Sequence, residues 1–421
     1  MIESIFLNTH RRYVALPLLG PLADDFVQWL SQCDYPRQTI RVMLGPIGQV
    51  DQWLRSRGID EITELDIPVM EACWTHFYRR SSGQGRALGS VIRALERYLE
   101  AKDLLRPTPP QPLTPSQRLL ATYTDHLLHV RGLAQSTIEE HQRHAGSLLD
   151  YLDCDTQPTC LESLSASQIE TFMGLSARRI GRGSAQHLVA HLRSFLRFLA
   201  AKGHCSSSLD TTIDTPRLYR LEQLPRALPW ETVQALLESI DRNTTIGLRD
   251  YTMLFLITSY GFRVSEVAAL TLDHIHWREG GLLVPQGKTR SSLKLPLTDR
   301  VAETLVRYLR HARPDHVSCR ALFLRSRIPI RPLGRTAVSM VFDRWAKRSG
   351  LTIPFGGAHC LRHAYAVHLL RTGATLKTIG DLLGHRDSDS TYVYLRLATE
   401  ELRDVALPLP TLSSPHQQGE L

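Results

Sequence analysis

Two arginines, two histidines, a lysine and a tyrosine between residues 263 and 394 have side chains suited to chemistry on an anionic ester. An arginine guanidinium stays charged and offers a planar fork of donors. A pair of arginines can therefore hold a phosphate and stabilise the charge that develops when it is attacked. A tyrosine hydroxyl, with a pKa of about 10, becomes a nucleophile once a base takes its proton. These residues are Arg263, Lys288, His359, Arg362, His385 and Tyr394.

Each of these residues lies at the end of a predicted element rather than within an apolar stripe. Gly261 ends one helix and can place Arg263 at the start of the next. Lys288 lies in the turn of a predicted β-hairpin, and His359 and Arg362 open a further helix. Core packing does not require polar residues in these contexts, so they favour a chemical role.

Taken in order, these residues resemble the tyrosine recombinase (phage integrase) family, which includes recombinases of the XerC and XerD type. The family pattern is an arginine in a Gly-x-Arg-x-Ser-Glu context, a hairpin lysine, a His-x-x-Arg, a Leu-Gly-His and a tyrosine nine residues later. The resemblance covers about residues 228–396, and residues 114–205 look like the helical core-binding domain of the family. The sequence supplies the pattern as Gly261–Glu266, Lys288, His359–Arg362, Leu383–His385 and Tyr394.

The resemblance implies how cleavage would occur. Arg263 and Arg362 would hold the scissile phosphate, and Tyr394 would attack it to form a 3′-phosphotyrosyl link. His359 is the candidate general base, as its place in the family motif implies. Tyr392 is the rival nucleophile, and the spacing from the Leu-Gly-His motif favours Tyr394.

The remaining residues of the set have supporting roles. Lys288, on a hairpin, suits the general acid that protonates the leaving 5′-oxygen, and Lys294 is its competitor. By the same resemblance, His385 would hydrogen-bond the phosphate. Glu266 would orient the groups around the phosphate without transferring a proton itself.

A second interpretation of the histidines is a metal site. His359 and His363 are four residues apart on a predicted helix, as in half of a zinc site, but the zinc-protease pattern needs a glutamate where this chain has Cys360. We therefore expect His363 to fix the helix and no metal to bind. No Gly-x-x-x-x-Gly-Lys-Ser/Thr motif occurs, and a phosphotyrosyl link retains the energy of the broken bond. We expect no cofactor or nucleotide.

The elements that must position these residues are mainly α-helical, with a small antiparallel β-sheet. Alternating apolar residues on either side of residues 287–290 predict a β-hairpin with a basic turn. The fold class is therefore helical DNA-binding modules followed by a tyrosine-recombinase catalytic domain. Apolar periodicity predicts helices in this domain over residues 231–240, 248–259, 299–311, 336–349, 358–372 and 376–383.

Two breaks divide the chain. Residues 106–112 hold four prolines in seven positions, which indicates a stiff linker, and residues 206–229 are rich in Ser, Thr, Asp and Pro. The predicted domains are an extra N-terminal helical module with its proline-rich linker at 1–112, a helical core-binding (SAM-like) domain at 113–207, a linker at 208–227, and a catalytic domain with a C-terminal tail at 228–421.

The N-terminal module resembles the core-binding domain. Residues 92–102 align with residues 192–202, and Thr39-Ile40 aligns with Thr137-Ile138. We interpret the module as a diverged copy that contacts DNA, although chance similarity between amphipathic helices and a solvated basic face stay open as alternatives. The arginines that repeat, and that we expect to face phosphates, are Arg93, Arg97, Arg193 and Arg197.

Bulk composition agrees with a DNA-binding protein. The net charge is +8, and 43% of the 421 residues are hydrophobic, which allows a substantial core and favours a polyanionic partner. The most apolar run, residues 253–257, is far below the roughly 20 residues of a membrane span, so we expect no membrane partner. Seven cysteines without a CxxC pair predict no disulfide framework and fit a reducing cytoplasm.

The function that these features imply is site-specific recombination of double-stranded DNA by a homotetramer, for integration or transposition of a mobile element. One alternative is a type IB topoisomerase, which would use a similar site but rejoin the same strand. The other is a non-catalytic DNA-binding protein on the same scaffold. Such a protein would have lost the tyrosine or an arginine, and this chain keeps both arginines and the tyrosine. Whether other recombinases act with it stays open.

Overall fold

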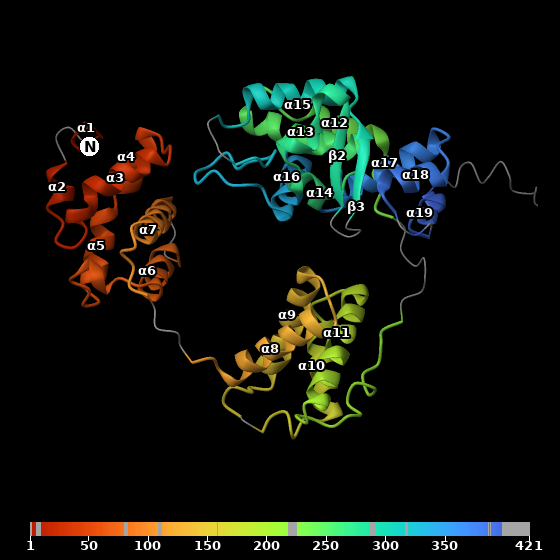
Figure 1. The fold of residues 1–421 in the computed structure, drawn as a ribbon, viewed down its shortest axis with the longest axis horizontal. Helices are drawn as coiled ribbons and strands as arrows, with labels where there is room; N and C mark the ends of the chain where they lie inside the picture. The colour runs from red at the N-terminus through yellow and green to blue at the C-terminus, as the bar shows by residue number, and fades with distance from the viewer. Residues whose placement is uncertain are drawn as a thin grey trace, which may run out of the picture. The chain divides into compact units, whose positions relative to one another are not determined.

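The computed structural model describes residues 2–5, 10–79, 83–107, 112–157, 159–217, 225–286, 291–315, 319–385, 387 and 389–397. The chain divides into two compact units, one of Met1–Arg106 with Gln223–Leu421 and the other of Pro107–Glu222. Figure 1 draws their helices and strands, coloured along the chain. Buried apolar residues form separate cores in the N-terminal part, the middle part and the C-terminal part. These cores support the predicted division of the chain into three, whose boundaries remain a prediction.

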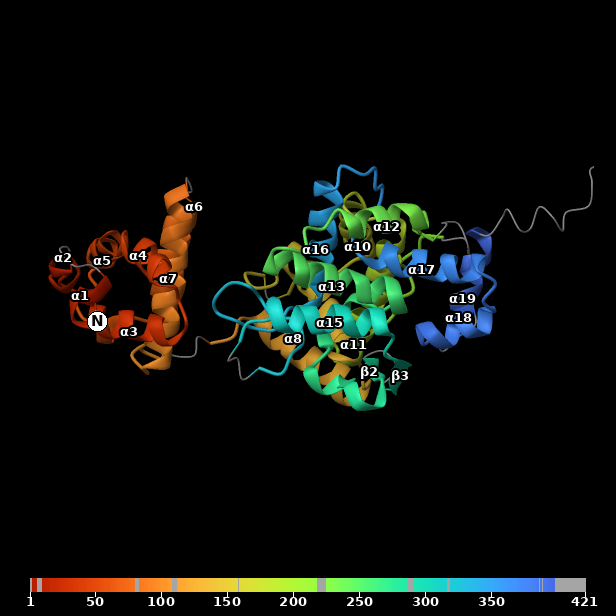
Figure 2. The same ribbon diagram turned by 90° about the horizontal axis from the view of Figure 1, so that it is seen from above.

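The N-terminal module is helical, and its helices pack their apolar faces inward. Phe26, Val27 and Leu30 recur at helical spacing on α3 and are fully buried. Helices α6 and α7 lie side by side (Figure 2). The elements are α1 (Ile2–Ile5), α2 (Arg11–Val14), η1 (Gly20–Leu22), α3 (Ala23–Gln32), α4 (Arg37–Leu44), α5 (Ile47–Arg55), η2 (Ile62–Glu64), α6 (Ile67–Arg79) and α7 (Gly83–Ala101).

The middle unit is a second helical module. Thr114 and Ser165 begin α8 and α10 with capping boxes, in which the side chain of the residue accepts a backbone N–H of the first turn. On α11, Leu192, Phe195 and Leu199 form the predicted buried stripe. The elements are α8 (Pro115–Asp125), η3 (His126–Val130), α9 (Gln135–Tyr151), α10 (Ala166–Ala177) and α11 (Arg182–Ala201).

The two helical modules share an order of elements. At an offset of 98 residues, α4 and α5 together span the positions that correspond to α9. Gly45 and Pro46 separate α4 from α5, because proline lacks the N–H that would continue the helix. Helices α6 and α7 then follow in the same order as α10 and α11, and Ile40 and Ile138, aligned in sequence, are both buried. This order supports the proposed duplication.

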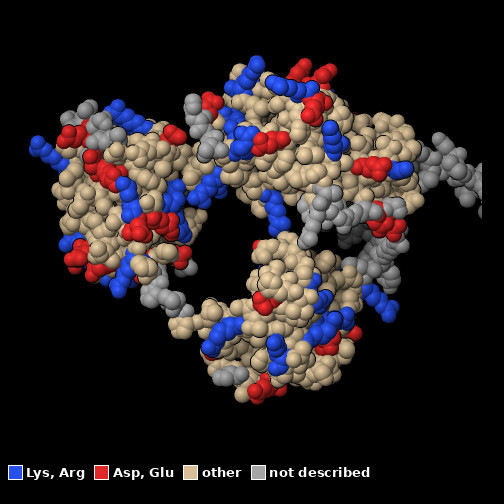
Figure 3. All heavy atoms as spheres, viewed as in Figure 1, with Lys and Arg blue, Asp and Glu red and all other residues tan. Residues whose placement is uncertain are grey.

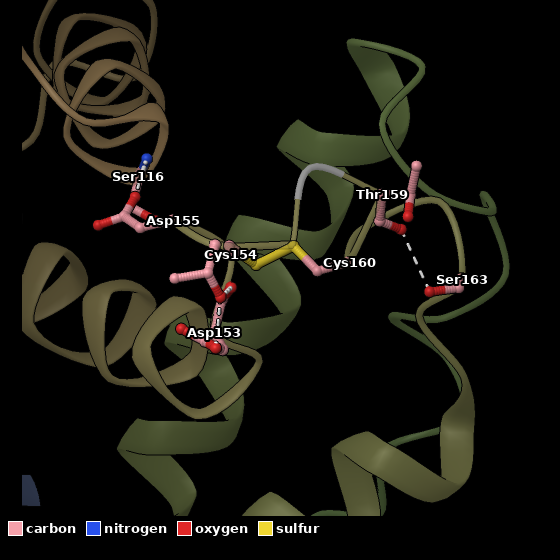
Figure 4. Close-up of a disulfide and its surroundings, with 8 residues drawn as sticks. Ser116, Asp153, Cys154, Asp155, Thr159, Cys160 and Ser163 are labelled. Atoms are coloured by element: carbon pink, nitrogen blue, oxygen red, sulfur yellow. Dashed lines mark hydrogen bonds between the residues drawn. A yellow bond between two sulfur atoms is a disulfide. The ribbon is translucent and has the colours of Figure 1, made fainter.

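A disulfide joins Cys154 to Cys160 in the turns between α9 and α10 (Figure 4). The turn after α9 brings the two Cα atoms to 5.5 Å, within the reach of a disulfide. Beside it, the backbone N–H of Ser116 donates to the Asp155 carboxylate at 2.9 Å. The expectation that the cysteines form no disulfide is wrong for this pair, because it weighed motif spacing and not the turn that brings the two residues together.

The C-terminal part is built around α13, whose residues are buried almost all round. Strands β1, β2 and β3 form an antiparallel sheet in that order, and β2 and β3 are the predicted hairpin. The elements are α12 (Trp230–Glu238), α13 (Thr245–Tyr260), α14 (Val264–Ala269), η4 (Leu272–His274), β1 (Ile275–His276), η5 (Trp277–Glu279), β2 (Gly281–Gln286), β3 (Ser291–Pro296), α15 (Asp299–His311), α16 (Arg335–Arg348), α17 (His359–Arg371), α18 (Leu376–Leu383), α19 (Asp389–Tyr392) and η6 (Val393–Leu397).

The predicted fold class is confirmed, with helices throughout and one small antiparallel sheet. Helices α15 and α18 have the predicted bounds, and α12, α13, α16 and α17 differ from theirs by a few residues at most. A helix beginning at Arg263 was predicted and is α14, but its bounds were not predicted, and neither was β1, because runs this brief carry little periodicity. None of the described helices combines the length and the apolar character that crossing a bilayer requires.

Candidate active site

Arg263 lies at the junction between α13 and α14. Helix α13 ends at Gly261, whose φ of 68° is left-handed, and a Cβ there would come within 2.4 Å of the Leu383 side chain. The glycine thus allows α18 to approach and turns the chain so that Arg263 becomes the N-cap of α14. The Glu266 carboxylate accepts the backbone N–H of Arg263 at 2.8 Å and pairs with its guanidinium at 2.6 Å.

Arg362 is buried in the first turns of α17, with its side chain only 3% exposed. Its guanidinium donates to the carbonyl of Gly261 at 2.6 Å and to the carbonyl of Leu383 at 2.8 Å. Burial first and the neighbouring Arg263 second lower the pKa of Arg362 to about 10, and Glu266 opposes this shift. Arg362 therefore stays cationic at neutral pH, and the two arginines share one carboxylate.

Two histidines lie one turn apart on α17. His359, in the first turn, is exposed, and its ring meets the ring of His363 edge-on at 4.5 Å between centroids. His363 Nδ1 lies 3.1 Å from the hydroxyl oxygen of Tyr394, within hydrogen-bond distance. Burial is the largest cause that lowers the pKa of His363 to about 4, followed by the charges of His359, Arg362 and His385.

His385 follows the end of α18. Gly384 ends this helix in the left-handed conformation, and a Cβ on it would come within 1.9 Å of the Gln286 amide at the end of β2. His385 Nδ1 lies 2.8 Å from the Thr391 hydroxyl oxygen, and its ring stacks beside that of Tyr394 at 6.4 Å. Burial, then Arg362 and Arg263, lower the pKa of His385 to about 4.

Tyr394 and Tyr392 have contrasting surroundings. Tyr394, in η6, is 2% exposed, whereas Tyr392, at the end of α19, is 52% exposed. Burial raises the pKa of Tyr394, while the charges of Arg362 and Arg263 oppose the rise. Helices α17, α18 and α19 pack together in the C-terminal part (Figure 1). Element η6, which carries Tyr394, packs against α17, which carries Arg362.

Of the two candidate lysines, only Lys294 lies among the described residues. Lys288 lies outside the described residues. Lys294 is on β3, where its ammonium lies 3.7 Å from the Glu279 carboxylate and its side chain is 69% exposed. The role of general acid therefore remains a prediction for Lys288.

The four arginines of the helical modules have local partners. Arg93 pairs with Glu96 at 2.7 Å and lies over the Trp74 ring, and Arg97 donates to the Tyr35 hydroxyl at 2.8 Å. These contacts lie on α7 and its neighbours in the N-terminal module.

In the middle unit, Arg193 donates to the Ile213 carbonyl at 2.6 Å, and Arg197 pairs with Asp210 at 2.9 Å. Lysines and arginines lie among aspartates and glutamates on the face of the protein shown in Figure 3. Contact of the four arginines with phosphate remains a prediction, and any phosphate would compete with the partners that they already have.

Sequence reasoning missed three contacts of the group. These are the His363–Tyr394 hydrogen bond, the Thr391 partner of His385, and the packing of Gln286 against Gly384. The spacing of four residues between His359 and His363 was the one available signal, because it places both rings on one face of a helix. Among the described residues, no three His, Cys, Asp or Glu side chains are arranged to hold a metal ion.

Comparisons with known proteins agree with this arrangement. Residues 226–401 match the phage integrase family, and residues 120–203 match the SAM-like N-terminal domain of phage integrases. The chain is 31% identical over 400 residues to the integrase/recombinase y4rA of Sinorhizobium fredii, covering 94% of this chain and 96% of that one. It is 32% identical over 291 residues to the tyrosine recombinase XerD of Listeria monocytogenes, covering 68% of this chain and 96% of XerD.

A solved structure has a similar fold. A lambda integrase tetramer bound to a Holliday junction matches with a TM-score of 0.51 and 20% identity, covering 70% of this chain and 88% of the integrase. The matched family models span both the middle unit and the part that carries the two arginines and the tyrosine. The chain belongs to the phage integrase family and is a site-specific DNA recombinase of the tyrosine type.

Proposed function

We propose that this recombinase cleaves DNA through Tyr394, which attacks a phosphate held by Arg263 and Arg362. The observation that carries the proposal is the buried Tyr394 hydroxyl, 3.1 Å from His363, with the charges of both arginines acting on it. Two fixed guanidiniums favour the extra negative charge on the non-bridging oxygens during attack. Glu266 holds both arginines in place.

The proton transfers complete the reaction. Tyr394 loses its proton to a histidine of α17, either His359 or His363, and His385 hydrogen-bonds the phosphate. Lys288 protonates the leaving 5′-oxygen. A 5′-hydroxyl from a partner duplex then attacks the phosphotyrosyl link, so the energy of the phosphodiester is retained and neither nucleotide nor metal is consumed.

Two rounds of exchange through a four-way junction need four active sites, and we propose a homotetramer on double-stranded DNA. The lambda integrase of similar fold was solved as a tetramer on a Holliday junction, which supports this assembly. A further recombinase as partner and a cytoplasmic site of action belong to the same proposal.

The N-terminal module supports a role beyond that of the XerD relatives. The relative from Sinorhizobium fredii matches 94% of this chain, whereas XerD matches 68% although nearly all of XerD is covered. We propose that the module contacts DNA outside the core site and that the enzyme integrates or transposes a mobile element.

A nicked suicide substrate tests the proposed function. The short fragment that carries the freed 5′-hydroxyl diffuses away after cleavage, so the full-length chain should accumulate as a covalent protein–DNA band, in EDTA and without nucleotide. A topoisomerase would relax supercoiled plasmid without exchanging strands between two sites. A chain that binds the duplex but forms no covalent band would instead be a non-catalytic DNA-binding protein.

A further inference from the structure

The proton of Tyr394 has two possible acceptors on α17, and the geometry separates them. His363 Nδ1 lies 3.1 Å from the Tyr394 oxygen, whereas His359 is exposed in the first turn of the helix and meets the ring of His363 edge-on. We infer that His363, rather than His359, is the general base that accepts the Tyr394 proton when the phosphate is attacked. This inference rests on the proposed function, in which Tyr394 is the nucleophile.

The hydrogen bond has a defined direction at neutral pH. Burial lowers the pKa of His363 to about 4 and raises the pKa of Tyr394, so both side chains are uncharged before DNA binds. A neutral phenol donates, and a neutral imidazole accepts through the ring nitrogen that carries no proton. Nδ1 therefore accepts from Tyr394, and the ring proton is on Nε2. The acceptor needed for proton removal is in contact with the nucleophile in the free protein.

The surrounding charges make this base dependent on the bound phosphate. His363 is faced by Arg362 and His359 from its own helix and by His385 from the segment after α18, and each of these groups, when charged, disfavours a further positive charge on its ring. A phosphodiester bound between the arginines brings a negative charge that offsets them, so an imidazolium becomes less unfavourable when a substrate is present. Tyr394 would thus be activated at the moment when a phosphate is available to attack.

The step balances in protons and bonds. The Tyr394 oxygen forms a bond to phosphorus, its proton moves to His363 Nδ1, and the bond from phosphorus to the 5′-oxygen breaks as that oxygen gains a proton from the general acid. In the second half-reaction the incoming 5′-hydroxyl gives its proton to the now deprotonated general acid and forms a bond to phosphorus. The bond from phosphorus to the Tyr394 oxygen breaks, and His363 returns its proton to that oxygen. His359 is then assigned to the phosphate rather than to the nucleophile.

A fluorinated nucleophile distinguishes a base from a structural residue. Single-turnover formation of the covalent band is measured for His363→Asn, His363→Gln and His359→Asn, each with Tyr394 or with 3,5-difluorotyrosine at position 394. Fluorine lowers the phenol pKa, so the altered nucleophile needs a base less. Helical circular dichroism and affinity for an uncleaved duplex show that each variant is folded, and Arg362→Lys is the matched control for a defect in phosphate stabilisation.

We expect His363→Asn to slow cleavage by about 10²- to 10⁴-fold, the usual effect of losing a general base. With difluorotyrosine at position 394, the cleavage rate of His363→Asn should rise by at least about tenfold. The rates of His359→Asn and Arg362→Lys should change little. The assignment would be overturned if difluorotyrosine rescued His359→Asn and not His363→Asn. Near-normal cleavage by folded His363→Asn and His363→Gln would also overturn it. A wild-type chain that forms no covalent band would instead overturn the proposed function.

Discussion

Arginines on the catalytic part and arginines on the helical modules have the same chemistry and different surroundings. Arg362 is buried and donates to backbone carbonyls at the ends of two other helices, while Arg263 shares Glu266 with it. Arg193 and Arg197, on α11, each bind one nearby carbonyl or carboxylate. Contacts with the end of α13 and with residues of α14 and α18 fix the side chains of the first pair. The second pair stabilises the packing around its own helix.

The difference indicates which surroundings would suit an arginine to the proposed active site. Charge alone does not, because all of these residues carry it. Fixed carbonyl partners from distant segments orient a guanidinium before a ligand arrives, and a fixed group costs no reorganisation during the reaction. Arg197, whose side chain is 61% exposed and bound to one carboxylate of its own module, has to exchange that partner for a phosphate, with little net gain.

The largest effect expected within the catalytic part comes from the nucleophile. Tyr394→Phe should abolish the covalent protein–DNA band and leave DNA affinity nearly unchanged, because phosphate contacts dominate affinity and only one hydroxyl is lost. Tyr392→Phe is the matched control and should still form the band, since Tyr392 is exposed. A band that persists in Tyr394→Phe and vanishes in Tyr392→Phe would reverse the assignment of the nucleophile.

The arginines test the comparison directly. Arg362→Lys and Arg263→Lys should each slow single-turnover cleavage by on the order of a hundredfold or more, since charge is kept but the fork of donors is lost. Arg193→Lys and Arg197→Lys should change the rate of cleavage by only a few-fold. Equal losses in all four variants would show that burial and carbonyl partners do not distinguish the two regions.

Removal of the N-terminal module should have a smaller effect on chemistry than on binding. A chain without residues 1–112 should still cleave a short core substrate but should bind longer sites less tightly, with a shorter footprint. Its affinity should also fall less steeply with salt, because fewer phosphates are contacted. Footprinting and titration at several salt concentrations measure both. An unchanged footprint and salt slope, with synapsis lost, would assign the module to protein contacts instead.

The smallest expected effect is the response of stability to acid. Burial lowers the pKa of His363, His385 and His191 to about 4 from the ordinary value of 6.5. The unfolded chain therefore binds more protons than the folded chain between these pH values. Stability is present above pH 6.5 and is lost as the pH falls toward 4.

Melting followed by circular dichroism should show a midpoint that drops by on the order of a few degrees between pH 7 and pH 5. His191→Gln should reduce this drop if the middle unit melts first, and His385→Gln should reduce it if the catalytic part does. A midpoint that rises as the pH falls would contradict the sign of the three shifts.

The sequence was enough to predict the longer elements and to propose the reactive residues, because both leave local signals. Examples are the spacing of apolar residues in α15 and α18 and the glycine at position 261, shortly before Arg263. Each of these signals depends only on residues that are close together in the sequence. Contacts between distant segments leave no such signal. The approach of His363 to Tyr394 depends on the packing of η6 against α17, and the Cys154–Cys160 bond depends on the turn after α9.

The carbonyl partners of Arg362 also bear on the stage of folding at which the enzyme becomes able to cleave DNA. Its guanidinium binds Gly261 and Leu383, which lie 101 positions before it and 21 positions after it in the chain. A chain still emerging from the ribosome cannot supply the second of these partners until α18 has been synthesised and has docked. We therefore expect strand cutting to begin only once α18 has docked, so that a partly melted molecule should not cut DNA.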